Sequence, residues 1–473
     1  MRVDFVGHAT LLLRMGGLSL LTDPWWSGPA YRGQWYPYPL PVPERYDLST
    51  LDAVYISHAH EDHLHPGTLR ELLKIAPDVE AIIPLRYDTQ MRDYLRRLGV
   101  KRSRELLSGT SCVLRKGDQS ARLTIMTNMD DSLLVVEDQT TGEVLVNAND
   151  ALHASRRDVI TEYCRILRAR FPAIDYLFCG FGGASYFPNC IHVPGKDDAA
   201  VARAREKFFL DNFALVARLL RPRMAFPFAA HFILPDDRTW WISRSRLQME
   251  PPAETVRRLV PEVPTYDLHP GDYVENGRLH TSSDTDYVAP ESARVAVLRR
   301  YSPNQEREPL NDVAFATLLE DIRHAVARPG AENLHAIIRL WDYPARAIEI
   351  EIQNGSACVS AIDPHSIEAA DAEVVVETRS DLVNSTIRSP FGRDLISIGY
   401  GAQVHLRSRE EMARAPHERL LNVLAPAQPR WRQRLRKTPL RTLGFVVGDP
   451  GMRLDLFSRL GQRVRGEEVD EPA

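Results

Sequence analysis

The densest group of metal-binding side chains in this 473-residue chain lies in SHAHEDHLHP, residues 57–66. The pattern His-x-His-x-Asp-His within it is formed by His58, His60, Asp62 and His63. Imidazole and carboxylate groups are good ligands for divalent transition metals. Without a metal, a buried cluster of this kind would leave several ring nitrogens without partners. The segment therefore predicts a site for two ions, one held by the first two histidines and the other by the Asp–His pair.

The flanking segments indicate how such a cluster would be positioned. The apolar run LDAVYI (51–56) is typical of a short buried strand. The segment PGTLRELLKIAP (66–77) has a proline at its start and apolar residues at helical spacing, which predicts a helix. The histidines would then fan out from a loop between a strand and a helix. The alternative is a solvated, histidine-rich turn.

Strand-like and helix-like segments alternate over residues 1–285, which predicts a layered α/β domain. The periodicity fades over 286–310, so we expect a linker there. Residues 311–415 combine helical and strand patterns and predict a smaller α+β accessory domain. Residues 416–473 form an arginine-rich C-terminal extension.

Composition narrows the class of protein. The chain is 44% hydrophobic and 26% charged with a net charge of −4, which is typical of a soluble globular protein and favours neither nucleic acid nor an anionic membrane as a partner. Its five cysteines include no Cys-x-x-Cys pair, which argues against a disulfide framework or a cysteine-ligated cluster. No signal peptide or long apolar stretch is evident, so the cytoplasm is the expected location.

The His-x-His-x-Asp-His pattern after a strand resembles the signature of the metallo-β-lactamase superfamily. The opening GHATLLLRMGGLSLLTDPWW looks like the first hairpin of the branch that contains the ascorbate-6-phosphate lactonases. The resemblance implies an αββα sandwich over residues 1–285. It also implies that Asp150, at the end of VLVNAND, bridges the metals, and that His231, after AFPFAA, is the last histidine ligand.

A narrower resemblance involves the segments GGASYFP, PFAAHF and PGD, in that order. They are similar to the metallo-β-lactamase-type domain of the CMP-N-acetylneuraminate hydroxylases. Those enzymes carry a Rieske iron–sulfur domain in front, which we do not expect here because the sequence has no Cys-x-His pair with the required spacing. In the accessory domain, AEVVVETRSDLVNSTI and FGRDLISIGYGAQVHLRS resemble a sterol-carrier-type domain.

One ligand of the family pattern is replaced. The family has a third histidine for the first metal, and here Asn128 takes its place, with Asp130 and Asp131 beside it. We expect Asp131 or Asp130 to be the ligand, with Asp131 preferred; a simple turn before the next strand would explain both residues equally well. A site with more oxygen donors tends toward iron or manganese over zinc.

Four further residues could support the site. His8 in VGHAT and Asp23 in TDPW could hold the ligands from behind, although a packed histidine and a turn cap are equal alternatives. Ser185 and Tyr186 in GFGGASYFP could bind substrate, and a tight structural turn would explain the glycines as well.

Two enzyme classes fit this set of residues. The first is a dinuclear, diiron oxygenase that hydroxylates a polar small molecule, such as a nucleotide sugar or a natural-product intermediate, with electrons from a separate electron-transfer protein. The alternative is a zinc- or manganese-dependent hydrolase of a lactone, ester or phosphoester, in which bound water is the nucleophile. Asp62 and Asp150 would be the catalytic carboxylates. The substituted third histidine ranks the oxygenase first. A metal-retaining binding protein is a third class, and it would be expected to have lost more of the ligands.

Overall fold

The computed structural model describes residues 1–282, 289–301, 309–328, 331–366, 371–389, 391–426 and 438–454.

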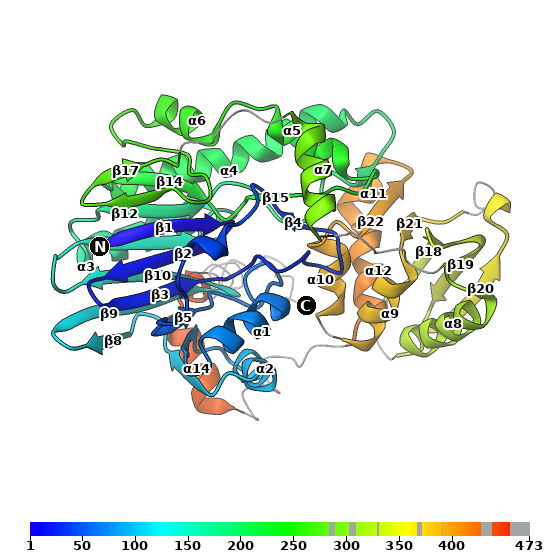
Figure 1. The fold of residues 1–473 in the computed structure, drawn as a ribbon. Helices are drawn as coiled ribbons and strands as arrows, with labels where there is room; N and C mark the ends of the chain where they lie inside the picture. Colours follow the sequence, from blue (N-terminus) through cyan, green and yellow to red (C-terminus); the bar gives the residue numbers. More distant parts are fainter. Residues whose placement is uncertain are drawn as a thin grey trace, which may run out of the picture.

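The first sheet combines strands from the beginning and the end of the predicted catalytic domain (Figure 1). The strand order of the first sheet is β17-β16-β1-β2-β3-β5-β6-β7. Its strands are β1 (Arg2–Gly7), β2 (Thr10–Met15), β3 (Leu18–Thr22), β5 (Ala53–Tyr55), β6 (Glu80–Pro84), β7 (Arg102–Leu106), β16 (Tyr273–Glu275) and β17 (Arg278–His280).

The second sheet has six strands in the order β14-β12-β11-β10-β9-β8. Its strands are β8 (Ser111–Lys116), β9 (Gln119–Asn128), β10 (Asp131–Asp138), β11 (Val144–Asn149), β12 (Tyr176–Gly180) and β14 (Met224–Phe228). The parallel pairs β11–β12 and β12–β14 form its far side. Parallel strands need long crossover connections, and these bring in the helices that cover the sheet.

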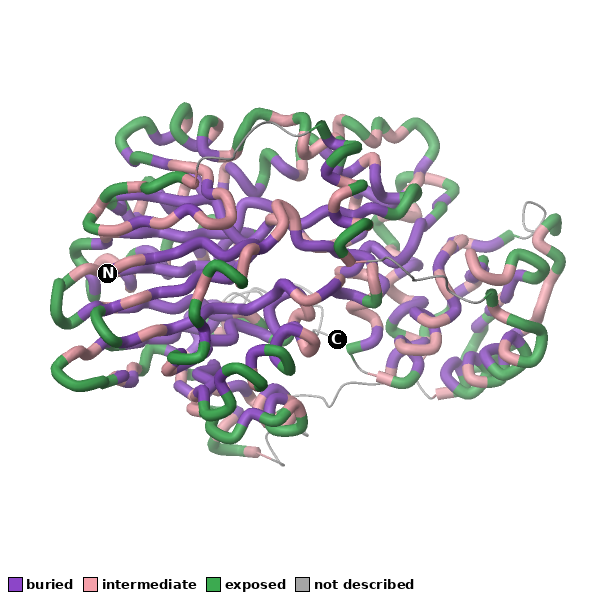
Figure 2. The backbone as a smooth tube through the Cα atoms, viewed as in Figure 1, coloured by how far each residue is buried: buried purple, intermediate pink, exposed green. Residues whose placement is uncertain are grey.

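The central strands of both sheets are buried on both faces, which explains why they are largely apolar runs. In β2, Leu11 and Leu13 point into the core between the sheets while Leu12 points to the outer helices. In β10, Leu134 and Val136 face the same central core, and the residues between them face outward. Figure 2 shows this burial as a continuous purple trace along the strands.

Helices cover the two outer faces. The first sheet is covered by α1 (Pro66–Ile75) and α2 (Gln90–Leu98), and the second by α3 (Arg157–Arg170), α4 (Asp198–Leu220) and α6 (Pro252–Leu259). The predicted αββα metallo-β-lactamase sandwich is therefore confirmed. Smaller elements link it to the rest of the chain: β4 (Tyr36–Pro37), β15 (Phe232–Ile233), η1 (Pro43–Arg45), α5 (Trp240–Leu247) and α7 (Pro290–Tyr301).

The helix α7 lies inside the segment that was expected to be a linker. Its weak periodicity has a simple cause: only one narrow row, Pro290, Ala293 and Val297, is buried, while Val295 is exposed. The linker 286–310 and the extension 416–473 lie partly outside the described residues, and the predicted domain boundaries stay a prediction. No helix among the described residues has the length and apolar character of a membrane span.

The smaller α+β unit is confirmed as a sheet with helices on one face (Figure 1). Its strand order is β13-β22-β21-β18-β19-β20. The strands are β13 (Ile191–His192), β18 (Leu334–Leu340), β19 (Tyr343–Gln353), β20 (Ser356–Ile362), β21 (Val374–Thr378) and β22 (Ala402–Leu406). The helices are α8 (Asp312–Val326), η2 (Pro364–Ser366), α9 (Ser380–Arg388), α10 (Gly392–Ser397), α11 (Arg409–Arg414) and α12 (Pro416–Leu424). The likeness to a sterol-carrier domain stays a prediction.

The two units share a strand pairing and a core. The edge strand β13 comes from the predicted catalytic domain but pairs with β22 of the accessory sheet. Trp35 is 1% exposed and stacks on Phe232 with ring centroids 3.7 Å apart. It also contacts Tyr31 and, across the junction, Tyr400 of the second unit. Burial of this ring therefore stabilises the junction as well as the loop that carries it.

We expect Trp35→Ala to lower the free energy of unfolding by about 3–5 kcal/mol, because a large buried ring is lost from a close-packed cluster. Chemical denaturation would measure the change. Ile75→Ala is a suitable control, since this side chain is 50% exposed on α1 and its loss should cost no more than about 0.5 kcal/mol. Equal effects of the two substitutions would contradict the role given to Trp35.

Candidate metal centre

Loops that follow different strands bring the candidate ligands to one edge of the sandwich. The His58–His63 segment follows β5, Asp150 follows β11, and Asp131 begins β10 after a tight turn. His8 lies in the turn between β1 and β2. Because strands of both sheets end here, residues far apart in sequence approach one another. Three groups of side chains have ligand atoms within 4.8 Å of one another: His8, Asp62 and His63; His58, His60 and Asp131; and His58, His63 and Asp150.

The shortest contacts link these groups into one cluster. Nε2 of His58 lies 2.8 Å from Nδ1 of His60 and 3.6 Å from Oδ1 of Asp131. Nε2 of His63 lies 3.1 Å from Oδ2 of Asp62 and 3.5 Å from Oδ2 of Asp150. We call these residues, together with His8, the His–Asp cluster.

The donor atoms of the cluster fit one or two cations. Nε2 of His63, Oδ1 of Asp131 and Oδ1 of Asp150 are buried and have no hydrogen-bond partner among the described residues. A buried polar atom without a partner costs free energy, and coordination to a metal would remove that cost. The mixture of imidazole and carboxylate donors suits iron, manganese or zinc.

Asp23 holds the cluster from behind. Its fully buried carboxylate accepts hydrogen bonds from the Ser57 backbone N–H at 2.7 Å and the Ser57 hydroxyl at 2.7 Å. It also accepts one from Asn149 Nδ2 at 2.8 Å and one from His63 Nδ1 at 3.0 Å. Since Nδ1 of His63 donates to this carboxylate, Nε2 is left as a lone-pair donor directed into the cluster.

The ring of His58 is oriented in the same way. The Ser57 hydroxyl donates its proton to Asp23, so it can accept a hydrogen bond from Nδ1 of His58 at 2.9 Å. That leaves a lone pair on Nε2 of His58, which lies 2.8 Å from Nδ1 of His60, to bind a cation. Serine at position 57 therefore sets the orientation of the imidazole that follows it.

Asp62 is held on both of its oxygens. The Tyr31 hydroxyl donates to Oδ1 at 2.7 Å, and Nε2 of His8 lies 3.0 Å from Oδ2. Sequence reasoning missed Tyr31, because nothing in its spacing distinguishes it from the other aromatics of the long early loop. His8 forms a group with Asp62 and His63 and also contacts Asp62, so its role in supporting the ligands stays a prediction.

Burial and the neighbouring charges shift the pKa values in opposite directions. Burial, together with the charges of His63 and His60, holds the pKa of His58 well below its usual range. Burial acts against protonation of His63 too, but Asp62 and Asp150 outweigh it and raise the pKa of His63. Burial raises the pKa of Asp131 to about 6. A cation in the cluster would replace the protons that these groups otherwise share.

The three polar side chains of the Asn128–Asp131 turn have different partners. Asp131 faces His58, while the 75% exposed side chain of Asp130 pairs with Arg86. Asn128 points away from the cluster, and its Nδ2 donates to the Ala151 carbonyl and to the Ser155 hydroxyl at 2.8 Å. Of the two aspartates considered, Asp131 therefore has the geometry of a ligand.

Among the described residues, His231 does not join any of the groups that form the His–Asp cluster. The strand β14 ends at Phe228, and Ala229 adopts a left-handed conformation, with φ of 55°, that turns the chain before His231. The ring packs between Phe5 and Phe181, with centroid distances of 5.1 and 5.3 Å. The strand therefore ends before His231. The role of His231 as a ligand stays a prediction.

Ser185 and Tyr186 take part in the junction with the second unit. The hydroxyl of Ser185 accepts from the Phe187 N–H at 3.1 Å within its own turn. The buried Tyr186 donates to Glu418 at 3.2 Å, and its N–H donates to the Ser397 carbonyl at 2.7 Å. Contacts of these two residues with substrate stay predictions.

The second unit reaches the cluster through α10. Gln34 Nε2 donates to the Leu395 carbonyl at 2.8 Å and to the Tyr31 carbonyl at 2.7 Å, which ties α10 to the loop that holds Asp62. Burial raises the pKa of Asp394, and the charge of His60 opposes that shift. Sequence reasoning could not find Asp394, because it lies in a different unit and in no recognisable motif.

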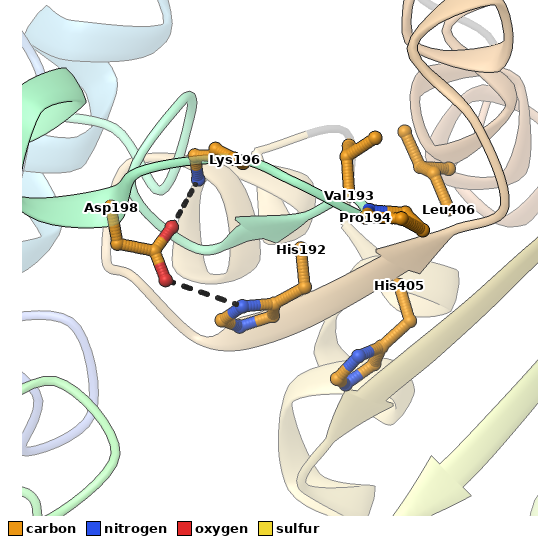
Figure 3. Close-up of a pocket in the computed structure, with 7 residues that line it drawn as sticks. All are labelled: His192, Val193, Pro194, Lys196, Asp198, His405 and Leu406. Carbon is orange, nitrogen blue, oxygen red and sulfur yellow. Dashed lines mark ion pairs between the residues drawn. The ribbon is translucent and has the colours of Figure 1, made fainter.

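A separate cavity of about 270 Å³ lies at the junction between β13 and β22 (Figure 3). The rings of His192 and His405 stack there with centroids 4.8 Å apart. Lys196 points to the carbonyl of Pro188 and to Asp198, whose Oδ1 lies 2.9 Å from its Nζ. Because the charge of this lysine is already neutralised, the cavity offers no free cation to an anionic ligand.

Comparisons with known proteins show which proteins the chain is similar to. Residues 2–157 match the family model described as a beta-lactamase superfamily domain. The predicted resemblance to the metallo-β-lactamase superfamily, and within it to the CMP-N-acetylneuraminate hydroxylases, is therefore confirmed. The structure of the CmlA beta-hydroxylase E377D mutant is similar with 16% identity and a TM-score of 0.40, covering 58% of this chain and 53% of that one.

Two relatives illustrate the level of similarity. The chain is 27% identical over 305 residues to the cytidine monophosphate-N-acetylneuraminic acid hydroxylase of Danio rerio, covering 60% of this chain and 48% of that protein. It is 31% identical over 216 residues to a protein of Mycolicibacterium smegmatis described as a Rieske 2Fe-2S iron–sulfur protein, covering 44% of this chain and 38% of that one. The chain thus spans less than half the length of these two relatives.

We expect Asp23→Asn to weaken metal binding by about 10- to 100-fold, because an amide would direct N–H groups at donors that now meet a carboxylate. Calorimetric titration with Zn²⁺ or Fe²⁺ would measure the dissociation constant. Asp4→Asn is a matched control, since Asp4 is also buried in the first sheet but pairs with Arg2 and Arg14. Equal losses of affinity in both variants would show that Asp23 acts through general stability alone.

Proposed function

We propose that the chain is a metal-dependent oxygenase with a dinuclear, diiron centre that hydroxylates a polar small molecule. One observation carries the proposal: Asp131, a carboxylate three residues after the Asn128 that replaces the third histidine of the family pattern, faces His58 and His60. Oxygen donors favour iron over zinc. The similarity to the Danio rerio hydroxylase supports the same reaction class.

The cluster divides naturally into two ligand sets. His58, His60 and Asp131 would hold one ion. Asp62 and His63, which form a group with His8, would hold the other, and His231 stays the predicted last ligand. Asp150 lies beside His63 and belongs to the group that also contains His58, so its carboxylate is suited to bridge the two ions.

Iron, when bound, would supply the redox chemistry that activates dioxygen. The chain's own residues would orient the reactants. The Tyr31 hydroxyl and His8 keep the Asp62 carboxylate in one orientation, and Asp23 keeps His63 in the tautomer that exposes Nε2. Because these supporting groups are buried and already hydrogen-bonded, little reorganisation is needed when substrate arrives.

The open side of the cluster is where substrate would enter. Ala59 is exposed, and Met129 is 52% exposed. A polar metabolite such as a nucleotide sugar or a natural-product intermediate would bind there, with its hydroxyl or amino groups toward the carboxylates of the cluster. Electrons would come from a separate electron-transfer protein.

The state of the five cysteines is relevant to the cellular compartment of the protein. All are free thiols, and four of them are buried. Free thiols are typical of reducing compartments, which supports a cytoplasmic enzyme.

A second candidate is a zinc- or manganese-dependent hydrolase of a lactone, ester or phosphoester. The observation that favours it is the complete His-x-His-x-Asp-His set with Asp150 beside it. In that case a metal would lower the pKa of bound water, and Asp150 would orient the resulting nucleophile.

We expect protein purified from cells grown without added zinc to contain two irons per chain, and the reduced centre to change its optical and Mössbauer spectra on exposure to oxygen. Metal analysis and the two spectra provide the test. Stoichiometric zinc, together with turnover of a lactone or phosphodiester, would contradict the oxygenase and support the hydrolase.

We expect Asp131→Ala and Asp150→Ala each to abolish retention of metal and activity together, because each removes a buried oxygen donor from the cluster. Metal content after gel filtration would measure retention. Asp130→Ala is the matched control: its exposed carboxylate pairs with Arg86, and its loss should leave the metal content unchanged. Full metal content in Asp131→Ala would remove the argument for iron.

A further inference from the structure

The C-terminal helix α14 (Pro439–Gly448) returns to the first sandwich and packs beside the loops that follow β6 and β7 (Figure 1). Arg441 donates to Glu105 at 3.0 Å and to the Arg86 carbonyl at 3.2 Å. The rings of Phe445 and Tyr87 meet edge to face with centroids 5.5 Å apart. The helix α14 is therefore docked close to the Asn128–Asp131 turn.

Asp449, directly after α14, is 0% exposed and contacts that turn. Its Oδ2 accepts a hydrogen bond from the Met129 N–H at 2.9 Å, and its Oδ1 accepts one from the Met452 N–H at 2.9 Å. The hydroxyl of Tyr163 lies 3.4 Å from Oδ1 and also donates to the Thr127 carbonyl. A buried carboxylate is costly unless donors surround it, and here the donors include the turn itself.

The turn needs such support. Met129 has φ of 53°, in the left-handed region that is unfavourable for a residue with a side chain. The hydrogen bond from its N–H to Asp449 stabilises that conformation. Two residues later, Asp131 places Oδ1 3.6 Å from Nε2 of His58. A change in the turn would therefore move a candidate ligand.

Asn128 connects the same turn to the other candidate carboxylate. Its Nδ2 donates to the Ala151 carbonyl and the Ser155 hydroxyl, in the segment that begins with Asp150. Gly451 lies against Asn128 so closely that a Cβ at position 451 would be 2.3 Å from Oδ1 of the amide. The chain after α14 thus contacts both Met129 and Asn128.

We propose that Asp449 is a positioning residue for the metal centre, which it serves by holding the Asn128–Asp131 turn so that Asp131 faces His58 and His60. The inference rests on the proposed function in one respect, namely that a metal binds at these three side chains. It assigns to the C-terminal segment a part in positioning ligands that lie more than 300 residues earlier in the chain.

The test compares Co²⁺ binding by the full-length wild type, Asp449→Ala and Asp449→Asn, using a competing chelator to measure affinity. Asp449→Ala should weaken the affinity for Co²⁺ of the site that contains Asp131 by about 10- to 100-fold. It should also alter the d–d absorption bands, which report coordination geometry. Asparagine should restore most of the affinity, because its carbonyl can still accept from the Met129 N–H. Leu443→Ala, at a 57% exposed position on α14, should match the wild type.

A purely structural role would change the melting temperature but leave the affinity and spectrum of the folded protein unaltered, and that result would overturn the proposal. If Asp449→Ala does not fold, Gly451→Ala tests the same contact from the other side, since its Cβ must displace Asn128, and wild-type binding there would overturn the proposal equally. A wild type that binds no Co²⁺, Zn²⁺ or Fe²⁺ would instead refute the proposed function itself.

Discussion

The buried carboxylate of Asp23 is the interaction on which the candidate site depends. It follows β3 and receives hydrogen bonds from Ser57 after β5, from Asn149 at the end of β11, and from His63. One side chain therefore joins both sheets and orients an imidazole at the same time. Such a charge is tolerated inside a protein only when donors surround it, so the geometry of the cluster and the packing of the strand ends depend on each other.

Hydrogen bonds from distant segments also position other parts of the cluster. Tyr31 holds Asp62 from the early loop, Gln34 ties that loop to α10, and Asp449 holds the turn that carries Asp131. Each of these comes from a segment outside the sandwich strands. The accessory unit and the C-terminal helix are thus connected to the candidate metal centre by hydrogen bonds, in addition to the apolar contacts that join them to the sandwich.

Much of the site could be predicted because its ligands are concentrated in sequence. His58, His60, Asp62 and His63 lie within one loop, and a strand–loop–helix context limits where they can point. Asp150 was found because it ends an apolar strand that the family pattern identifies. The sequence gives no signal that the strand ends before His231, because the apolar run through Phe228 continues without a break. Only the left-handed backbone at Ala229 ends the strand there.

The sequence by itself determined the sandwich, because strands buried on both faces must be continuous apolar runs and these alternate with amphipathic helices. It also determined which loop would hold the metal-binding residues. Only the tertiary structure decided that Asp131 faces His58 while Asp130 turns to Arg86, that His8 lies among the candidate ligands, and that Asp449 holds the turn that carries Asp131. The physical reason is that these choices depend on contacts between segments tens to hundreds of residues apart, which local periodicity and composition do not encode.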